Sequence, residues 1–127
     1  MRVIVNNKRY EHITTELTRK AKIEYSDNTG TTLANTLTLD PTGTRLTYSL
    51  TFDSAFKDQQ ALESLWNDLI IPRRNGIAIT MPYNQTEISF KAKVENVEQG
   101  YTTTYKGDRV WDKISVDFES LTPFLEG

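Results

Sequence analysis

The chain offers few side chains whose types and spacing could support catalysis or metal binding. His12 is the only histidine in 127 residues, and the chain contains no cysteine. A transition-metal site would have to combine His12 with carboxylates alone, so a surface histidine is the better interpretation. Carboxylates such as Asp53 and Asp58 could act as an acid and base pair only if the fold brought them together. Because no nucleophile elbow, phosphate-binding loop or zinc-protease motif occurs either, we expect no catalytic residue, cofactor or metal, and no enzymatic activity.

Two short motifs have a structural explanation that is better than the functional one. Asp27-Asn28-Thr29-Gly30 lacks the regular oxygen ligands and the closing glutamate of a calcium loop, and its composition is typical of a turn. Asn84-Gln85-Thr86 matches a glycosylation acceptor, but no secretion signal opens the chain. We therefore interpret both as turns.

The net charge of −2 argues against a general nucleic-acid binder, which needs a basic surface to displace counterions from phosphate. The basic groups at 19–22 and at Arg73-Arg74 are more typical of a solvated face or of a protected strand edge. No apolar segment approaches the length that would cross a bilayer. We therefore expect no nucleic-acid specificity and no membrane insertion.

The first half of the chain reads as strands joined by turns. Asn6-Asn7 predicts a tight turn because asparagine tolerates positive φ. Residues 18–26 alternate apolar and polar side chains, and Asp40-Pro41-Thr42-Gly43 has the signature of a type I turn. The clearest strand covers Leu46 to Phe52, whose apolar side chains all share one face.

One amphipathic helix follows and is predicted over residues 59–70. Apolar side chains recur at i, i+3, i+4 and i+7, and Asp58 precedes them as an N-cap. Pro72 ends the helix. We expect Trp66 to lie in the core, where its truncation would cost about 3–5 kcal/mol.

Strands resume after the helix. Ile77 to Tyr83 and the return segment to Val94 read as a hairpin turning at residues 83–86, Gly100 predicts a bulge or bend, and Val110 to Pro123 reads as a closing strand. The order of strands, one helix and strands predicts a single domain over residues 1–127. It is mainly β, an antiparallel sandwich or partly open barrel with the helix packed against it. The predicted core consists of Leu46, Tyr48, Leu50, Phe52, Leu62, Leu65, Trp66, Leu69, Ile88, Phe90, Val94, Ile114, Val116 and Phe118.

A small β protein with long strands must protect its sheet edges, and a closed ring does so by pairing each subunit's edge with the next subunit. The Tyr25 to Leu39 hairpin and the Tyr101 to Arg109 loop are polar and rich in threonine, so we expect one or both to contact a neighbouring subunit. Tyrosine and tryptophan are enriched at such interfaces. The candidate interface residues are Asn28, Thr29, Thr31, Tyr101, Tyr105 and Trp111.

These segments together resemble small tail proteins of long-tailed bacteriophages and prophages of Gram-positive hosts. The residues that carry the resemblance are the strand 46–52, the helix with Leu65-Trp66 that ends at Pro72, the hairpin 77–94 and the closing segment 110–123. The resemblance covers most of the chain as an architecture rather than as a sharp motif. It implies a fold like that of tail-tube and distal-tail proteins.

The resemblance further implies a virion structural protein of the tail, made in the host cytoplasm. Such proteins assemble as homo-oligomeric rings, commonly hexamers, and contact other phage tail proteins. The chain is short and lacks a second domain that could recognise a host, so the resemblance favours a tube, connector or baseplate ring. The alternative is a small ligand-binding or carbohydrate-binding β module in which Trp111 and tyrosines form a stacking platform.

Overall fold

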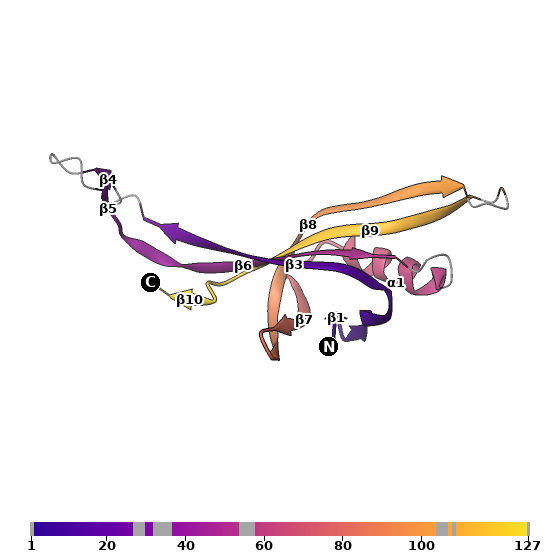
Figure 1. Ribbon diagram of the computed structural model, residues 1–127, viewed down its shortest axis with the longest axis horizontal. Helices are drawn as coiled ribbons and strands as arrows, with labels where there is room; N and C mark the ends of the chain where they lie inside the picture. The colour runs from indigo at the N-terminus through magenta and orange to yellow at the C-terminus, as the bar shows by residue number, and fades with distance from the viewer. Residues whose placement is uncertain are drawn as a thin grey trace.

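The computed structural model describes residues 2–26, 30–31, 37–53, 58–103, 107 and 109–126. The molecule is long and narrow, and two ribbons of paired strands extend in opposite directions from a central body (Figure 1). The described elements, in chain order, are β1 (Ile4–Val5), β2 (Lys8–Arg9), the 3-10 helix η1 (Glu11–Ile13), β3 (Thr14–Tyr25), β4 (Gly30–Thr31), β5 (Leu37–Thr38), β6 (Pro41–Phe52), α1 (Gln59–Leu69), β7 (Ile77–Tyr83), β8 (Thr86–Thr103), β9 (Arg109–Ser120) and β10 (Leu125–Glu126).

The larger sheet has eight strands, and every pairing in it is antiparallel. β6 lies in its middle, with β3 on one side and β9 and β10 on the other. β8 pairs with β7 as far as Ala92 and with β9 from Ala92 onward, so the sheet turns at this residue. β1 continues the sheet beyond β7. The predicted fold class is therefore confirmed as mainly antiparallel β with one α-helix, consistent with a sandwich or partly open barrel.

One hydrophobic cluster joins the sheet to α1. Most of the predicted core residues are buried in this cluster. They are Leu46, Tyr48, Leu50, Phe52, Leu62, Leu65, Leu69, Ile114, Val116 and Phe118. Trp66, Ile88, Phe90 and Val94 lie at its border and are only partly buried. The hydroxyl of Tyr48 donates to the carbonyl of Pro82 at 2.9 Å, and burial raises the pKa of this phenol. The cluster also takes Val3, Val5, Tyr10, Ile13, Ile77, Ile79, Met81 and Ala92, which the predicted core did not include.

The helix forms as predicted, ending one residue earlier. The carboxylate of Asp58 accepts a hydrogen bond from the backbone N–H of Ala61 at 3.1 Å, which satisfies an otherwise free donor of the first turn. Leu62, Leu65 and Leu69 face the core. Trp66 lies on the flank of this stripe, so its indole is half-buried rather than central, contrary to the prediction.

The predicted turn at Asp40-Pro41-Thr42-Gly43 is wrong. Pro41 begins β6 opposite Tyr25, and Gly43 lies opposite Glu24, so Thr42 is the extra residue of a β-bulge. The turn signature is a local preference, and the continuous pairing of β3 with β6 outweighs it, since proline is tolerated at the first residue of a strand.

The turns at Asn6-Asn7 and at Asn84 form as the sequence predicts. Asn6 and Asn7 have φ of 53° and 66°, and Asn84 has φ of 52° at the tip of the β7–β8 hairpin. These positive values are the reason that asparagine is favoured there. The predicted turn at 27–30 lies largely outside the described residues.

Two bulges interrupt the pairing of β8 with β9. Glu95 and Glu98 lie opposite Asp117 and Ser115, so β8 carries an extra residue there, and Asn96 in it has φ of 53°. Beyond it, Gln99 lies opposite Ile114 and Tyr101 lies opposite Trp111, so the extra residue of the second bulge is on β9. This confirms the irregularity predicted at Gly100. It also returns Trp111 to the face that carries the buried Ile114.

We predict that Leu65→Ala lowers the free energy of unfolding by about 2–5 kcal/mol, because Leu65 is fully buried on the core face of α1. Trp66→Ala should cost less, because part of the indole already contacts water. Urea melts of both variants measure the difference. A larger loss for Trp66→Ala would show that the tryptophan, not the leucine stripe, attaches the helix.

We also predict that Gly76→Ala destabilises the fold by more than about 1 kcal/mol. Gly76 has φ of +73°, and a Cβ there would lie 2.5 Å from the carbonyl oxygen of Ala92. Gly100→Ala is the matched control, since its Cβ would meet nothing closer than 3.9 Å. Equal melting temperatures for the two variants would contradict the close approach of the two backbones at Gly76.

Candidate assembly surfaces

The β3–β6 arm, which we define as Ala21–Tyr25 paired with Pro41–Leu46, projects from one end of the body (Figure 1). β9 pairs with β6 only from Thr47 onward, so most of this arm is a two-stranded ribbon with the short β10 beside it. Ile23 lies opposite Thr44 and shares the sheet face of the buried Leu46. Ile23 and Tyr25 nevertheless remain 55% and 45% exposed. The core face of the sheet thus continues outward without a cover from the described part of the chain.

Polar contacts hold this arm in place at its base and on its other face. Arg19 lies over the Tyr83 ring, with its guanidinium carbon 5.2 Å from the ring centre, and it donates to Asn84 Oδ1 at 2.9 Å. Arg45 pairs with Glu24 and donates to the carbonyl of Leu121 at 2.7 Å. These contacts fix the direction of the ribbon without covering Ile23 and Tyr25.

The β8–β9 arm, defined as Gln99–Thr103 paired with Arg109–Lys113, projects from the opposite end (Figure 1). Tyr101 and Trp111 stack across it with ring centres 4.9 Å apart and an interplanar angle of 23°. They remain 57% and 50% exposed. As in the first arm, apolar side chains on the core face of the sheet extend past the end of the core.

A cavity of about 370 Å³ lies between this arm and α1. Its walls combine the two tryptophans with polar side chains, and they consist of Glu63, Trp66, Asn67, Gln99 and Trp111. The amide of Gln99 already donates to the carbonyl of Asp112 at 2.8 Å. The cavity could therefore accept an apolar or aromatic group with a few polar contacts at its rim.

Two of the long strands have open edges among the residues that the structure describes. β3 pairs only with β6, and β8 has no partner on its outer side beyond Ala92. The two edges lie on opposite sides of the β3-β6-β9-β8 part of the sheet. Exposed Lys20 and Lys22 on β3 and the bulge at Asn96 on β8 protect these edges against unspecific pairing.

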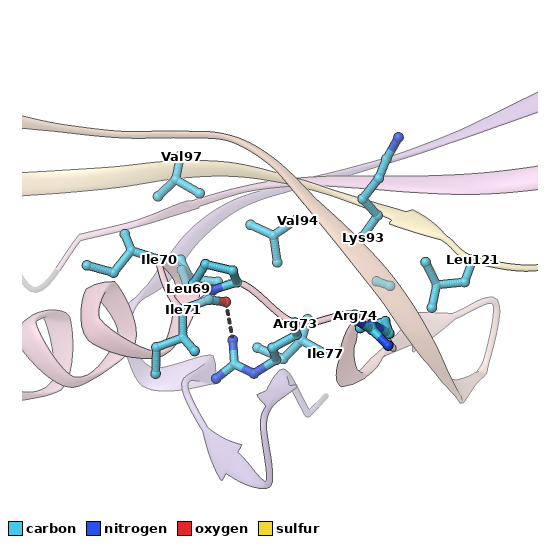
Figure 2. Close-up of a pocket in the computed structure, with 13 residues that line it drawn as sticks. Leu69, Ile70, Ile71, Arg73, Arg74, Ile77, Lys93, Val94, Val97 and Leu121 are labelled. Atoms are coloured by element: carbon cyan, nitrogen blue, oxygen red, sulfur yellow. Dashed lines mark hydrogen bonds between the residues drawn. The ribbon is translucent and has the colours of Figure 1, made fainter.

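An apolar groove, which we call the Ile71 groove, runs between the end of α1 and β8. It measures about 410 Å³ and is lined mainly by Leu69, Ile71, Pro72, Ile77, Val94 and Val97. Figure 2 shows Ile70 and Ile71 below Val94 and Val97. Arg73, Arg74 and Lys93 also line the groove. Ile70 and Ile71 are each 51% exposed. Arg73 donates to the carbonyls of Asp68 and Ile71.

The described residues contain no group of three or more histidine or acidic side chains that could hold a metal ion. Nε2 of His12 lies 2.9 Å from Oδ2 of Asp58, the residue that caps α1. This contact, followed by the hydrogen bond from the N–H of Ala61, holds the pKa of the Asp58 carboxyl below its usual value. His12 therefore supports the start of the helix.

The structure brings together only part of the predicted interface. Tyr101 and Trp111 are exposed and stacked, while Thr31 lies in β4. Asn28, Thr29 and Tyr105 lie outside the described residues. Sequence reasoning missed Ile23, Tyr25, Ile70 and Ile71 as surface residues, because alternation and helical spacing are the usual signals of burial.

No protein-family model matches the chain, and neither do any curated proteins or solved structures. Among the described helices, none is long and apolar enough to cross a membrane. The resemblance to phage tail proteins therefore enters below as a proposal.

We predict a pH-dependent contribution from Asp58. Because its folded pKa is lowered, the charged carboxylate adds stability above the ordinary aspartate pKa of about 3.9, and this is lost as the pH falls through the folded value. Asp58→Asn keeps a capping oxygen but loses the charge. In urea melts, the free energy of unfolding of the variant should therefore lie below that of the unaltered protein at pH 7. The two free energies should become equal near pH 3. Asp58→Ser is the control for an uncharged cap, and an equal gap at both pH values would contradict the assignment.

Proposed function

We propose that the protein is a structural subunit of a phage or prophage tail that works by assembling into a homo-oligomeric ring. The observation that carries the proposal is the continuation of the core face into two opposite arms, where Ile23, Tyr25, Tyr101 and Trp111 are about half exposed. Apolar side chains that extend past a core in this way lose contact with water when a partner covers them.

The position of the two arms favours a ring over a symmetric dimer. The arms lie at opposite ends of the molecule, and the open edges of β3 and β8 lie on opposite sides of the β3-β6-β9-β8 part of the sheet. A contact that joins one end of a subunit to a different surface of the next is heterologous, and it closes into a ring when the rotation between subunits is a whole fraction of a turn. A dimer made by one self-complementary surface would leave the other arm uncovered.

The tail assignment rests on the sequence resemblance together with this shape. An antiparallel sheet that carries one helix and sends strand ribbons to both sides suits a subunit whose edges are completed by neighbours. We assign no reaction to it. Its proposed partners are copies of itself and other tail proteins.

A carbohydrate-binding module is the second candidate, and the cavity with Trp66 and Trp111 is the observation that favours it. Tryptophan faces flanked by Glu63, Asn67 and Gln99 offer both stacking and hydrogen bonds to a sugar ring. Titration of the protein with oligosaccharides while tryptophan fluorescence is followed tests it. Saturable quenching that Trp111→Ala abolishes, in a protein that remains monomeric, would favour this function over the ring.

We predict that the protein forms closed rings of one defined mass, measured by native mass spectrometry and seen by negative-stain electron microscopy. Trp111→Asp should prevent them while the melting curve changes little, because the stack with Tyr101 contributes only about 0.5–1.5 kcal/mol to the fold. Lys113→Asp is the matched control, an exposed position on the same strand, and should assemble. A protein that stays monomeric up to millimolar concentration would overturn the ring.

A further inference from the structure

We propose that the cavity between α1 and the β8–β9 arm binds a guanidinium group, the planar cation that an arginine side chain carries. The cavity measures about 370 Å³, and all of its described walls come from one subunit. The inference therefore goes beyond the proposed ring and does not depend on it. It rests on the charge of the cavity, on its two indole rings and on its free acceptor oxygens.

The charge of the cavity comes from Glu63. Among the described residues that line the cavity, Glu63 is the one charged side chain. The neighbouring acidic side chains have partners, since Asp58 contacts His12 and Asp68 pairs with Lys8. Glu63 forms no ion pair or hydrogen bond with the described chain. A cavity that holds one unpaired carboxylate attracts a cation rather than an anion.

Indole rings from two different elements form the aromatic walls. Trp66 comes from α1, and Trp111 comes from the β8–β9 arm, which lies above the helix in Figure 1. Tyr101 stacks on Trp111 with ring centres 4.9 Å apart, but it is not part of the cavity wall. Tyr101 therefore covers one face of Trp111 and leaves the rest of the indole to the cavity. Tryptophan is the ring that attracts cations most strongly, and a flat guanidinium stacks on its face.

Free acceptor oxygens favour a cation that carries N–H groups. Glu63 and Asn67 are four residues apart on α1, so their side chains are neighbours on one face of the helix. The side-chain amide of Gln99 donates to the carbonyl of Asp112 at 2.8 Å, which directs Nε2 toward the strand and leaves Oε1 without a partner. A guanidinium carries several N–H donors in one plane, so it can bind both oxygens of a carboxylate while it stacks on a ring.

The same features distinguish a guanidinium from other ligands of an aromatic cavity. A sugar ring is neutral, so it would stack on the indoles but leave the charge of Glu63 uncompensated. A lysine ammonium would compensate the charge, but it is a strongly hydrated point charge without a flat face. Of these three ligands, the guanidinium is the one that uses the charge, the rings and the acceptors together.

NMR spectroscopy can detect this binding, because the chain has two tryptophans and both line the cavity. The probe is N-acetyl-arginine amide, and its neutral isostere N-acetyl-citrulline amide is the matched control ligand. We expect the arginine compound to shift both indole N–H signals saturably, with an affinity roughly tenfold higher than that of the citrulline compound. Equal affinities for the two compounds, or no saturable shift with the arginine compound, would overturn the proposal.

A pair of variants tests the role of the carboxylate. Glu63→Gln removes the charge but keeps the size and helix propensity of the side chain, and it should weaken binding of the arginine compound roughly tenfold. Glu98→Gln is the matched control, because it makes the same change of net charge at an exposed position outside the cavity wall. Unchanged binding by Glu63→Gln, or an equal loss in both variants, would refute the site.

Two further probes identify the source of the guanidinium. Free arginine carries its own amino and carboxylate groups, whereas the tripeptide Gly-Arg-Gly presents the side chain as a partner protein would. Tighter binding of the tripeptide assigns the cavity to an arginine of a partner protein, and tighter binding of free arginine assigns it to a small molecule. Shifts that oligosaccharides cause and the arginine compounds do not would overturn the proposal in favour of a sugar site. A protein that binds the arginine compound but forms no rings would refute the proposed function and leave this site in place.

Discussion

The pairing of β6 with a strand on each side is the constraint on which the rest of the structure depends. Leu46, Tyr48, Leu50 and Phe52 alternate on β6 and are all buried. A shift of one residue in register would turn all four side chains toward water. Their burial therefore fixes the register in which β3 and β9 pair with β6. The same face receives the leucine stripe of α1, and the turn of β8 at Ala92 brings β7 and β1 around the cluster.

Extension of these strands beyond the core produces the surfaces that we propose for assembly. A strand keeps alternating its faces after the elements above it end, so side chains on the core face emerge uncovered on both arms. On the β8–β9 arm, the second bulge restores this alignment and places Trp111 with Tyr101. On the β3–β6 arm, the extra residue of the bulge is Thr42 on β6, so Ile23 and Tyr25 remain on one face of β3. The assembly surfaces are thus the outer parts of the same faces that form the core.

The two ends of the molecule differ in chemistry, and this difference gives a direction to any contact between copies. The β3–β6 arm presents Ile23 and Tyr25 near a Glu24–Arg45 ion pair, whereas the β8–β9 arm presents the stacked Tyr101 and Trp111. A contact between unlike surfaces repeats from subunit to subunit. The proposed tail ring follows from this asymmetry combined with the resemblance of the sequence to tail proteins.

The sequence by itself determined the helix, its Asp58 cap, the asparagine turns and the buried strand faces, because each depends on spacing or on a local backbone preference. Only the tertiary structure decided where the alternation stops being buried. Ile23 and Tyr25 have the pattern of a core strand, yet they stay about half exposed in the described part of the chain. Trp66 has the same helical spacing as Leu62, yet it lies at the border of the hydrophobic cluster. The turn predicted at Asp40-Pro41-Thr42-Gly43 failed for the same reason, since long-range pairing with β3 outweighs a local signature. Burial is a property of neighbours distant in sequence, and a pattern read along one strand does not contain them.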